Sequence, residues 1–406
     1  MSNVSINQFL DRRIQARLKE ANEQDWSSII VLSKDIKDKK LEQEFKNHNA
    51  RIKYKLDIIK AYAIEFPCKC IEKLALMPEV DFIADDATLS TLMDIARPTI
   101  GGAKADQYNL TGNGIGIAII DTGVYPHADL TLEKNRIVAF KDFVKGLEFP
   151  YDDNGHGTHV AGVAAGNGYM SDGKYRGIAP KANIIAVKSM DKNGSGNTSD
   201  IVAGMQWILE NKNRYNIRIL SLSIGSDPDL MENEDPLVKG VNVLWDAGIV
   251  VVAAAGNSGP NQRTINSPGI SQKIITIGSS DDNGTTNIKD DTIAEFSSRG
   301  PTKEKILKPD IVAPGVDILS LDSDKEFIPK QGIRRYRFKK MENPYKEMSG
   351  TSMATPVVSG AIALLLEKDS KLTPDQVKTK LIESAVSLNA KKNAQGNGQM
   401  NIENIL

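Results

Sequence analysis

Long apolar runs alternate with helix-like segments over most of the chain. The apolar runs lie at 115–120, 184–187, 249–255 and 274–278, with a more broken one at 217–224. Such runs suit strands that are covered on both faces. Segments with helical spacing lie between them, at 159–165, 199–210 and 236–246. The alternation predicts an α/β domain of three layers, with a parallel sheet between two layers of helices.

The N-terminal part of the chain has shorter elements. Strand-like runs lie at 29–32, 51–56, 61–66 and 80–83, and helix-like stretches at 35–47 and 68–76. The resulting order, β-α-β-β-α-β, is the ferredoxin-like plan. We therefore predict two domains, a small α+β domain at 1–89 and a larger α/β domain at 90–406. The aperiodic segment from Asp85 to Lys104 is expected to link them.

Three polar residues stand at or near the ends of predicted strands. Asp121 follows the run 115–120 directly, Ser223 lies near the end of 217–224, and Asn257 lies just beyond 249–255. Ligands of open parallel sheets bind at the carboxyl ends of the strands, so a functional site is expected there. Taken alone, Asp121 also reads as an ordinary strand-ending residue and Asn257 as a turn residue.

Ser352 opens another apolar run, 353–366, that reads as a buried helix. The start of a helix offers unpaired N–H groups and the positive end of the dipole, which can hold an oxyanion. Gly350 would let a substrate approach the backbone closely. The simpler interpretation of Ser352 is a helix N-cap.

Two of the four histidines lie in the glycine-rich segment 154–162, NGHGTHVAG. Glycines on both sides of His156 leave its imidazole open to a substrate, whereas His159 is expected to be structural. Their spacing could suggest a metal pair, but there is no HExxH motif and no obvious third ligand. A serine nucleophile needs a base, and the base needs a group that orients it. His156 and Asp121 can fill these two roles for Ser352.

The order Asp121, His156, Asn257, Ser352 is the one found in subtilisins. Five motifs, IIDTGV, NGHGTHVAG, AAGNSGP, KPDIVAPG and SGTSMATP, occur in sequence over roughly 104–386. Through them the chain resembles subtilisin-like serine proteases, specifically bacterial intracellular-type members with an N-terminal inhibitory propeptide. The resemblance implies a serine endopeptidase in which Asp121, His156 and Ser352 form the triad. Asn257 and the Ser352 N–H would form the oxyanion hole, and the chemistry would need no cofactor.

The resemblance also implies how a polypeptide substrate is held. An extended peptide would pair with two edge segments, Gly194-Ser195-Gly196 and Ser223-Ile224-Gly225. The first of these also reads as a flexible loop. Asn266 stands where the family often has a glycine at the floor of the specificity pocket, which would shorten or polarise that pocket.

The N-terminal domain is expected to act as an intramolecular inhibitor, with its tail from Asp85 onward in the substrate cleft. Self-cleavage is expected between Asp86 and Arg97. The candidate residues before the cut are Leu89, Leu92 and Met93, of which we favour Leu89 or Leu92.

Departures from the family pattern concern metal binding and one insertion. The segment 167–176 does not reproduce the family's strong calcium loop, although Asp129 could still be a ligand, so a structural calcium stays open. The connection 322–346 is long, and its basic run 334–340 reads as a solvated loop or an anion-binding patch. Cys68 and Cys70 are one residue apart, which suits free thiols better than a disulfide or a zinc site.

Composition narrows the classes of partner. The 406 residues are 40% hydrophobic with a formal net charge of −1, which is typical of globular domains and argues against a nucleic-acid binder. The most apolar run is far shorter than the ~20 residues that span a bilayer, so no membrane is expected. The polar start of the chain and its two cysteines favour a cytoplasmic location, with non-classical export as the alternative.

Rival functions are weaker. A catalytically silent binding or scaffold protein on the same fold would not need all four groups of the site. Hydrolysis of small esters would be a side activity of the same chemistry. The glycines of 112–116 precede a predicted strand, whereas those of a dinucleotide-binding motif follow one.

Overall fold

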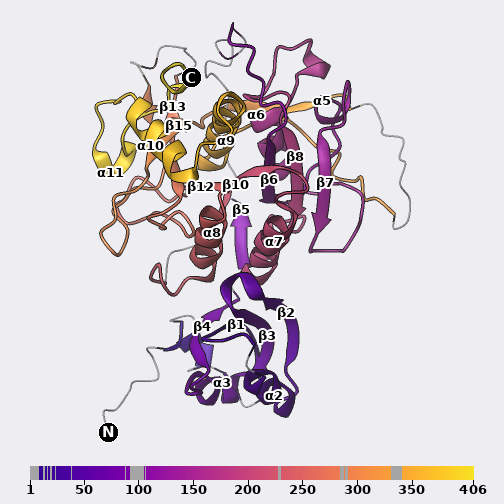
Figure 1. Cartoon of the computed structure of the whole chain (residues 1–406), viewed down its shortest axis with the longest axis vertical. Coiled ribbons are helices and arrows are strands. Elements are labelled where there is room, and N and C mark those ends of the chain that lie inside the picture. Colours follow the sequence, from indigo (N-terminus) through magenta and orange to yellow (C-terminus); the bar gives the residue numbers. More distant parts are fainter. Residues whose placement is uncertain are drawn as a thin grey trace.

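The computed structural model contains two units, a small one below a larger one in Figure 1. It describes residues 9–11, 14, 15, 17, 18, 21, 22, 24–37, 39–86, 88–91, 105, 107–226, 230–283, 288, 291–330 and 341–406. The predicted boundary between residues 89 and 90 falls inside a strand, β5 (Thr88–Thr91), that extends from the small unit into the larger one.

The small unit is an antiparallel sheet with two helices. Its strands run in the order β2-β3-β1-β4. In chain order its elements are β1 (Trp26–Ser33), α2 (Lys40–Asn47), β2 (Arg51–Leu56), the 3-10 helix η2 (Asp57–Ile59), β3 (Ala61–Pro67), α3 (Cys68–Ala75) and β4 (Val80–Asp85). The predicted β-α-β-β-α-β order is therefore confirmed.

The two faces of this small sheet bury different partners, because successive residues of a strand point to opposite sides. One face packs with α2 and α3 in a core of its own, which includes Ile29, Val31, Tyr62, Ile64 and Ile83. The other face joins the core of the larger unit through Ile30, Leu32, Ala61, Ala63, Phe82 and Ala84. The small unit therefore depends on the larger one to cover half of its apolar surface.

The larger unit is built on a mainly parallel sheet. Within the described residues, the strand order is β14-β13-β12-β10-β6-β8-β7, and β15 also pairs with β13. The strands are β6 (Gly116–Asp121), β7 (Ile137–Asp142), β8 (Asn183–Lys188), β10 (Ile217–Leu222), β12 (Val250–Ala254), β13 (Ile275–Asp281), β14 (Thr292–Ile293) and β15 (Ile311–Pro314). Every pairing is parallel except that of β13 with β14.

Helices cover both faces of this sheet, as the three-layer prediction requires (Figure 1). One layer contains α6 (His156–Ala165) and α9 (Thr351–Lys368), which pack against each other, and the other contains α7 (Thr198–Asn211) and α8 (Pro236–Asp246). The small unit packs against α7 and α8. The remaining helices are α5 (Ala128–Thr131), η3 (Tyr169–Ser171), α10 (Pro374–Ser384), α11 (Lys392–Gln395) and α12 (Ile402–Ile405).

Two smaller sheets complete the larger unit. β5 lies between β9 (Ser195–Asn197) and β11 (Ile224–Gly225) in a three-stranded sheet. β16 (Ile318–Leu321) and β17 (Tyr345–Met348) form an antiparallel pair. This pair joins the two ends of the long connection 322–346, whose basic run 334–340 lies outside the described residues.

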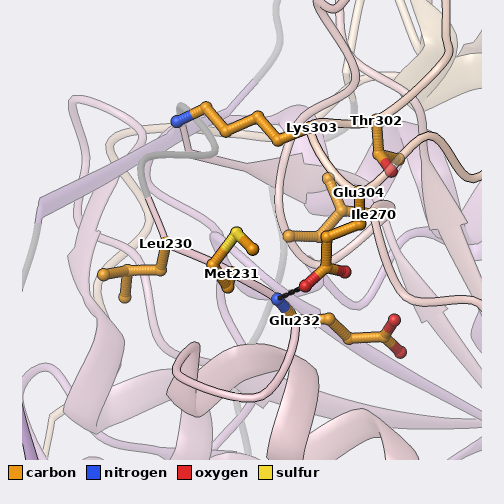
Figure 2. A pocket seen from close by; sticks show the side chains of 7 residues that line it. All are labelled: Leu230, Met231, Glu232, Ile270, Thr302, Lys303 and Glu304. Atoms are coloured by element: carbon orange, nitrogen blue, oxygen red, sulfur yellow. Dashed lines mark hydrogen bonds between the residues drawn. The ribbon is translucent and has the colours of Figure 1, made fainter. Parts of the chain in front are cut away.

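A small surface hollow lies beside the segment that leads into α8. It is lined by Leu230, Met231, Glu232, Ile270, Thr302, Lys303 and Glu304 (Figure 2). The Glu232 N–H closes part of it by donating to Glu304 Oε1 at 3.3 Å. None of the predicted site residues lines this hollow, so it has no part in the chemistry below.

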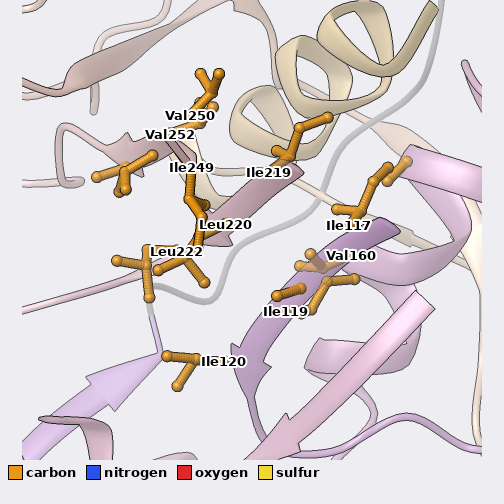
Figure 3. Packing of buried hydrophobic residues seen from close by; sticks show 14 of the residues in the cluster. Ile117, Ile119, Ile120, Val160, Ile219, Leu220, Leu222, Ile249, Val250 and Val252 are labelled. Carbon is orange, nitrogen blue, oxygen red and sulfur yellow. The ribbon is translucent and has the colours of Figure 1, made fainter. Parts of the chain in front are cut away.

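The core of the larger unit supports the strand ends that carry the site. Apolar residues of β6, β10, β12 and α6 meet there, among them Ile117, Ile119, Val160, Leu220 and Val252 (Figure 3). All five are at most 1% exposed. Such a close-packed core fixes the positions of the residues at the ends of its strands and helices.

Among the residues described, no helix combines the length and the apolar character needed to cross a membrane.

Candidate active site

The predicted catalytic residues occupy element ends. Asp121 is the last residue of β6, His156 is the first of α6, and Ser352 is the second of α9. Asn257 follows β12 by three residues. Asp121, His156 and Ser352 are at most 1% exposed in this structure.

Asp121 and His156 form a direct pair. The Asp121 Oδ1 atom lies 2.8 Å from His156 Nδ1, and the same oxygen accepts the Thr122 N–H at 2.7 Å. A carboxylate at Nδ1 favours the imidazole tautomer in which Nδ1 carries the proton and Nε2 can accept one. The pair therefore has the geometry of a general base with its orienting group.

Gly157 permits this pair to form. A Cβ atom on Gly157 would lie 2.1 Å from the Gly123 carbonyl oxygen and 3.0 Å from Asp121 Cβ. The first turn of α6 thus packs against the turn after β6 without an intervening side chain. The glycine after His156 is needed for this close approach as well as for access to the imidazole.

Ser352 is tied to Ser223 by two reciprocal hydrogen bonds. Ser352 Oγ donates to the Ser223 carbonyl at 3.1 Å, and Ser223 Oγ donates to the Ser352 carbonyl at 2.8 Å. Pro356 lies inside α9 and lacks the N–H that would otherwise bond the Ser352 carbonyl. Ser223 supplies that missing donor, so the start of α9 is bonded to the residue that follows β10.

Asn257 is held so that its amide nitrogen can donate. Its Oδ1 atom accepts the Thr351 N–H and the Thr351 hydroxyl, both at 3.0 Å. With the oxygen bound to Thr351, the Nδ2 group and the neighbouring Ser352 N–H are both donors near the nucleophile. Two such donors suit a developing oxyanion.

His159 has a structural environment, in agreement with the prediction. It is fully buried, and its Nε2 atom lies 3.0 Å from the Ile318 carbonyl and 3.1 Å from the Lys346 carbonyl. Burial, aided by the neighbouring His156, lowers the pKa of His159 to about 3. The ring is therefore neutral and links α6 to the β16–β17 pair.

The two predicted substrate-binding segments flank the tail of the small unit. In the antiparallel register, Ser90 of β5 lies opposite both Ser195 and Gly225. Leu89 lies opposite Gly196, and Thr91 lies opposite Ile224. The tail thus pairs with both segments that are predicted to hold a substrate. Gly194 lies in the turn before β9 with a φ of +75°.

A charged contact that the sequence did not reveal anchors the start of this tail. Both carboxylate oxygens of Asp86 accept hydrogen bonds from Ser199, from its N–H and its hydroxyl, each at 2.7 Å. Lys53 and Tyr54 of β2 bond Asp200 at 3.0 and 2.9 Å. The first turn of α7 therefore binds the small unit through polar groups.

The Asn266 side chain packs against Gly225 of β11, the strand that pairs with the tail. It is 5% exposed, and a Cβ on Gly225 or on Gly256 would come within 2.9 Å of its side chain. Its Oδ1 atom is buried without a hydrogen-bond partner in the described structure. Asn266 thus places a buried polar atom beside Gly225 and Gly256, and its role in a specificity pocket stays a prediction.

Both carboxylate oxygens of Asp129 have hydrogen-bond partners in this structure. Its Oδ1 accepts the Met170 N–H at 2.9 Å, and its Oδ2 accepts the Tyr345 hydroxyl at 2.8 Å. Calcium needs six to eight oxygen ligands. The described part of the chain holds no group of three or more His, Cys, Asp or Glu side chains suited to a metal ion. Asp129 therefore connects η3 and β17 in this structure, and calcium binding at Asp129 stays a prediction.

Comparison with known proteins gives one consistent result. Residues 112–398 match the model of the subtilase family. The chain is 45% identical to the serine protease AprX of Bacillus subtilis (strain 168) over 349 residues, which is 83% of this chain and 74% of that protein. It is 30% identical to a thermostable alkaline protease of Halalkalibacterium halodurans, over 91% of this chain and 89% of the relative.

A solved structure has the same fold. The crystal structure of fervidolysin from Fervidobacterium pennivorans, a keratinolytic enzyme related to subtilisin, superposes with a TM-score of 0.72 at 22% identity. The match covers 95% of this chain and 61% of that one.

Proposed function

The chain belongs to the subtilase family of serine proteases, and we propose that it is an endopeptidase made as a self-inhibited precursor that cleaves its own chain. The observation that carries this proposal is the position of β5. The tail of the N-terminal unit pairs with β9 and β11, next to Ser223, and Ser223 is hydrogen-bonded to Ser352.

In the proposed mechanism, Ser352 Oγ attacks the peptide carbonyl while His156 Nε2 takes its proton. Asp121 holds the imidazole by its Nδ1 atom and stabilises the charged ring. The Asn257 amide and the Ser352 N–H bind the oxyanion. His156 then gives the proton to the leaving amine, and water hydrolyses the acyl-enzyme by the reverse series of steps.

The register of β5 favours one bond for self-cleavage. Ser90 faces Gly225 and Thr91 faces Ile224, so the described pairing ends one residue short of Ser223, the residue bonded to Ser352. Leu92 and Met93 themselves lie outside the described residues. Leu89 faces Gly196, three residues earlier, or roughly 10 Å along an extended strand. We therefore propose the bond after Leu92.

The N-terminal unit would remain bound after the cut and block the cleft. Its pairing through β5, its Asp86–Ser199 hydrogen bonds and its apolar face all persist when one bond at the end of the tail is broken. While covalently attached, the tail is held at a high effective concentration. Release or digestion of the N-terminal unit would then open the site to polypeptide substrates.

We further propose that the protein acts in the cytoplasm and needs neither a cofactor nor a nucleic-acid or membrane partner. Cys68 and Cys70 are free thiols, which suits a reducing compartment. Cell fractionation that finds the protein only in the culture medium, without lysis, would contradict the location.

Intact mass, combined with an active-site serine phosphonate, tests the main proposal on two purified chains. Wild-type protein should appear as two fragments, the larger beginning at residue 93, and should take up the phosphonate. Ser352→Ala should remain a single chain of 406 residues and take up none. A start outside 87–98, or the same processing in Ser352→Ala, would contradict self-cleavage. A wild type that takes up no phosphonate and does not digest casein would favour the silent scaffold.

A further inference from the structure

A hydrogen-bond relay formed by Thr122 and Asp152 connects β6 and α6, the two elements that carry Asp121 and His156. We propose that Asp152, acting through Thr122, is a positioning residue that holds the orienting carboxylate and the base at their working distance. The inference rests on the proposed roles of Asp121 and His156. It adds two residues that lie outside the proposed triad and oxyanion hole.

Asp152 is fully buried and accepts five hydrogen bonds from three segments. Its Oδ1 accepts from Thr122 Oγ1 at 2.9 Å and from the N–H groups of Asn154 and Gly155 at 3.0 and 2.8 Å. Its Oδ2 accepts from Thr158, from the N–H at 2.9 Å and the hydroxyl at 2.7 Å. The carboxylate thus joins the turn after β6, the loop before His156 and the first turn of α6.

Thr122 is the link to the catalytic pair. Its N–H donates to Asp121 Oδ1, its hydroxyl donates to Asp152, and the same hydroxyl accepts the Gly157 N–H at 3.0 Å. Gly157 directly follows His156. One fully buried threonine therefore bonds the orienting carboxylate on one side and the peptide beside the base on the other.

The donors around Asp152 explain why both side-chain atoms at this position must be oxygens that accept hydrogen bonds. A buried carboxylate is costly unless hydrogen bonds satisfy it. Here every donor is neutral and belongs to a segment that must keep its place for the 2.8 Å Asp121–His156 contact. Asparagine at position 152 would put an amide N–H against a donor from Thr122 or Thr158. Loss of the relay would let α6 shift relative to β6. Because a small misplacement of reacting groups lowers the rate constant strongly, kcat should fall.

The chain offers a matched control in Asp142. This carboxylate is 4% exposed and accepts hydrogen bonds from the N–H groups of Val144, Lys145 and Leu147 and from the Tyr151 hydroxyl. It resembles Asp152 in burial and accepts four hydrogen bonds where Asp152 accepts five, but none of the four comes from Asp121, Thr122 or His156. A general effect of weakening a buried aspartate should appear equally in both.

The test compares Thr122→Val, Thr122→Ser, Asp152→Asn and Asp142→Asn in the full chain. The rate of self-cleavage, the kcat and KM of the processed enzyme on a peptide, phosphonate labelling and the thermal midpoint are measured for each. We expect Thr122→Val and Asp152→Asn to lower kcat by roughly 10- to 100-fold with KM within about threefold. Thr122→Ser keeps the hydroxyl and should stay within about threefold of wild-type kcat. Asp142→Asn should lower the thermal midpoint at least as much as Thr122→Val does, with kcat unchanged.

Three results would overturn the inference in a wild type that is labelled and active. These are a Thr122→Val enzyme with near wild-type kcat, a Thr122→Ser enzyme as slow as Thr122→Val, and an Asp142→Asn enzyme with the same loss of kcat as Asp152→Asn. A wild type that takes up no phosphonate would instead overturn the proposed function, and the positioning role with it.

Discussion

His159 should make the folded protein lose stability as the pH falls below neutrality. Burial lowers the pKa of its imidazole from 6.5 to about 3 in the folded state. Between these two values the unfolded chain binds a proton at this residue and the folded chain does not. The unfolded state therefore gains protons as the pH falls, and the free energy of unfolding must fall with it.

The size of the effect follows from the two pKa values. Each pH unit between them is worth about 1.4 kcal/mol. Relative to about pH 8, where both states are neutral at this residue, the loss at about pH 5 is on the order of 2 kcal/mol. Burial also lowers the pKa of His127, so the whole protein should lose more than His159 alone accounts for.

Urea unfolding of the Ser352→Ala chain across this pH range measures the effect without self-digestion. In a His159→Gln variant, the amide can still donate to the Ile318 or Lys346 carbonyl but cannot take up a proton. Its free energy of unfolding should be lower than the parent's at about pH 8 and should fall less on acidification. Ile362→Val, a buried change without a titratable group, should run parallel to the parent. A His159→Gln curve that is also parallel to the parent would refute the reasoning.

Four further predictions concern the site. Asn257→Ala should lower kcat by about 10²–10³-fold with little change in KM, a magnitude taken from the loss of this type of donor in a subtilisin. Steady-state kinetics on a peptide measure both constants, and a change in KM alone would contradict the oxyanion role. Gly157→Ala should reduce the rate of self-cleavage about 100-fold or more, because the new Cβ would lie 2.1 Å from the Gly123 carbonyl oxygen. Gly204→Ala should process normally, because the nearest atom to its Cβ would be a side-chain atom of Val187 at 3.0 Å. Gel analysis of the two variants measures both rates. Asn266→Gly should raise kcat/KM for peptides with a large aromatic residue before the cut, relative to peptides with leucine there. If this ratio of kcat/KM values is unchanged in a substrate panel, Asn266 does not line the specificity pocket. Addition of EDTA should leave the thermal midpoint of the full chain unchanged, since the oxygens of Asp129 already bond protein donors; a large drop would show that a divalent cation is bound elsewhere.

The sequence predicted the parts of the fold that are buried on both faces. The runs that became β6, β8, β10 and β12 are almost wholly buried, so burial left a continuous apolar signal. β7 was missed because it lies at the edge of the sheet and only its two end residues are buried. β15 was missed because its four residues are too short a run to stand out from the loop before them.

The predicted catalytic residues stand out in the sequence because each lies in a local motif, whereas the groups that hydrogen-bond near them do not. The carboxylate of Asp152 accepts hydrogen bonds from Thr122 and from Thr158, and Asp86 accepts one from Ser199, 113 residues later in the sequence. Such contacts join side chains to loop backbone and have no period in the sequence. The run 353–366 predicts the helix that contains Pro356, and only the structure shows that Ser223 donates to the Ser352 carbonyl that Pro356 leaves open.

The choice between the two leucines proposed for self-cleavage shows most clearly what a sequence leaves undecided. Leu89 and Leu92 are equivalent as candidates because both are apolar, and both lie in the same aperiodic segment. β5 joins β9 and β11 through backbone groups, which every residue carries, so the pairing itself contains no preference for either leucine. The choice comes from register, and the register is set by what holds the tail at its start. Asp86 is bound to the first turn of α7, and the strand that follows can then reach Ser223 only after a fixed number of residues. If this reasoning holds, inserting one alanine after Asp86 should move the cut by one residue along the sequence, to the bond after Thr91, while the Asp86–Ser199 contact stays in place. N-terminal sequencing of the processed inserted chain tests this, and a cut that still follows Leu92 would show that the pocket, and not the register, selects the bond.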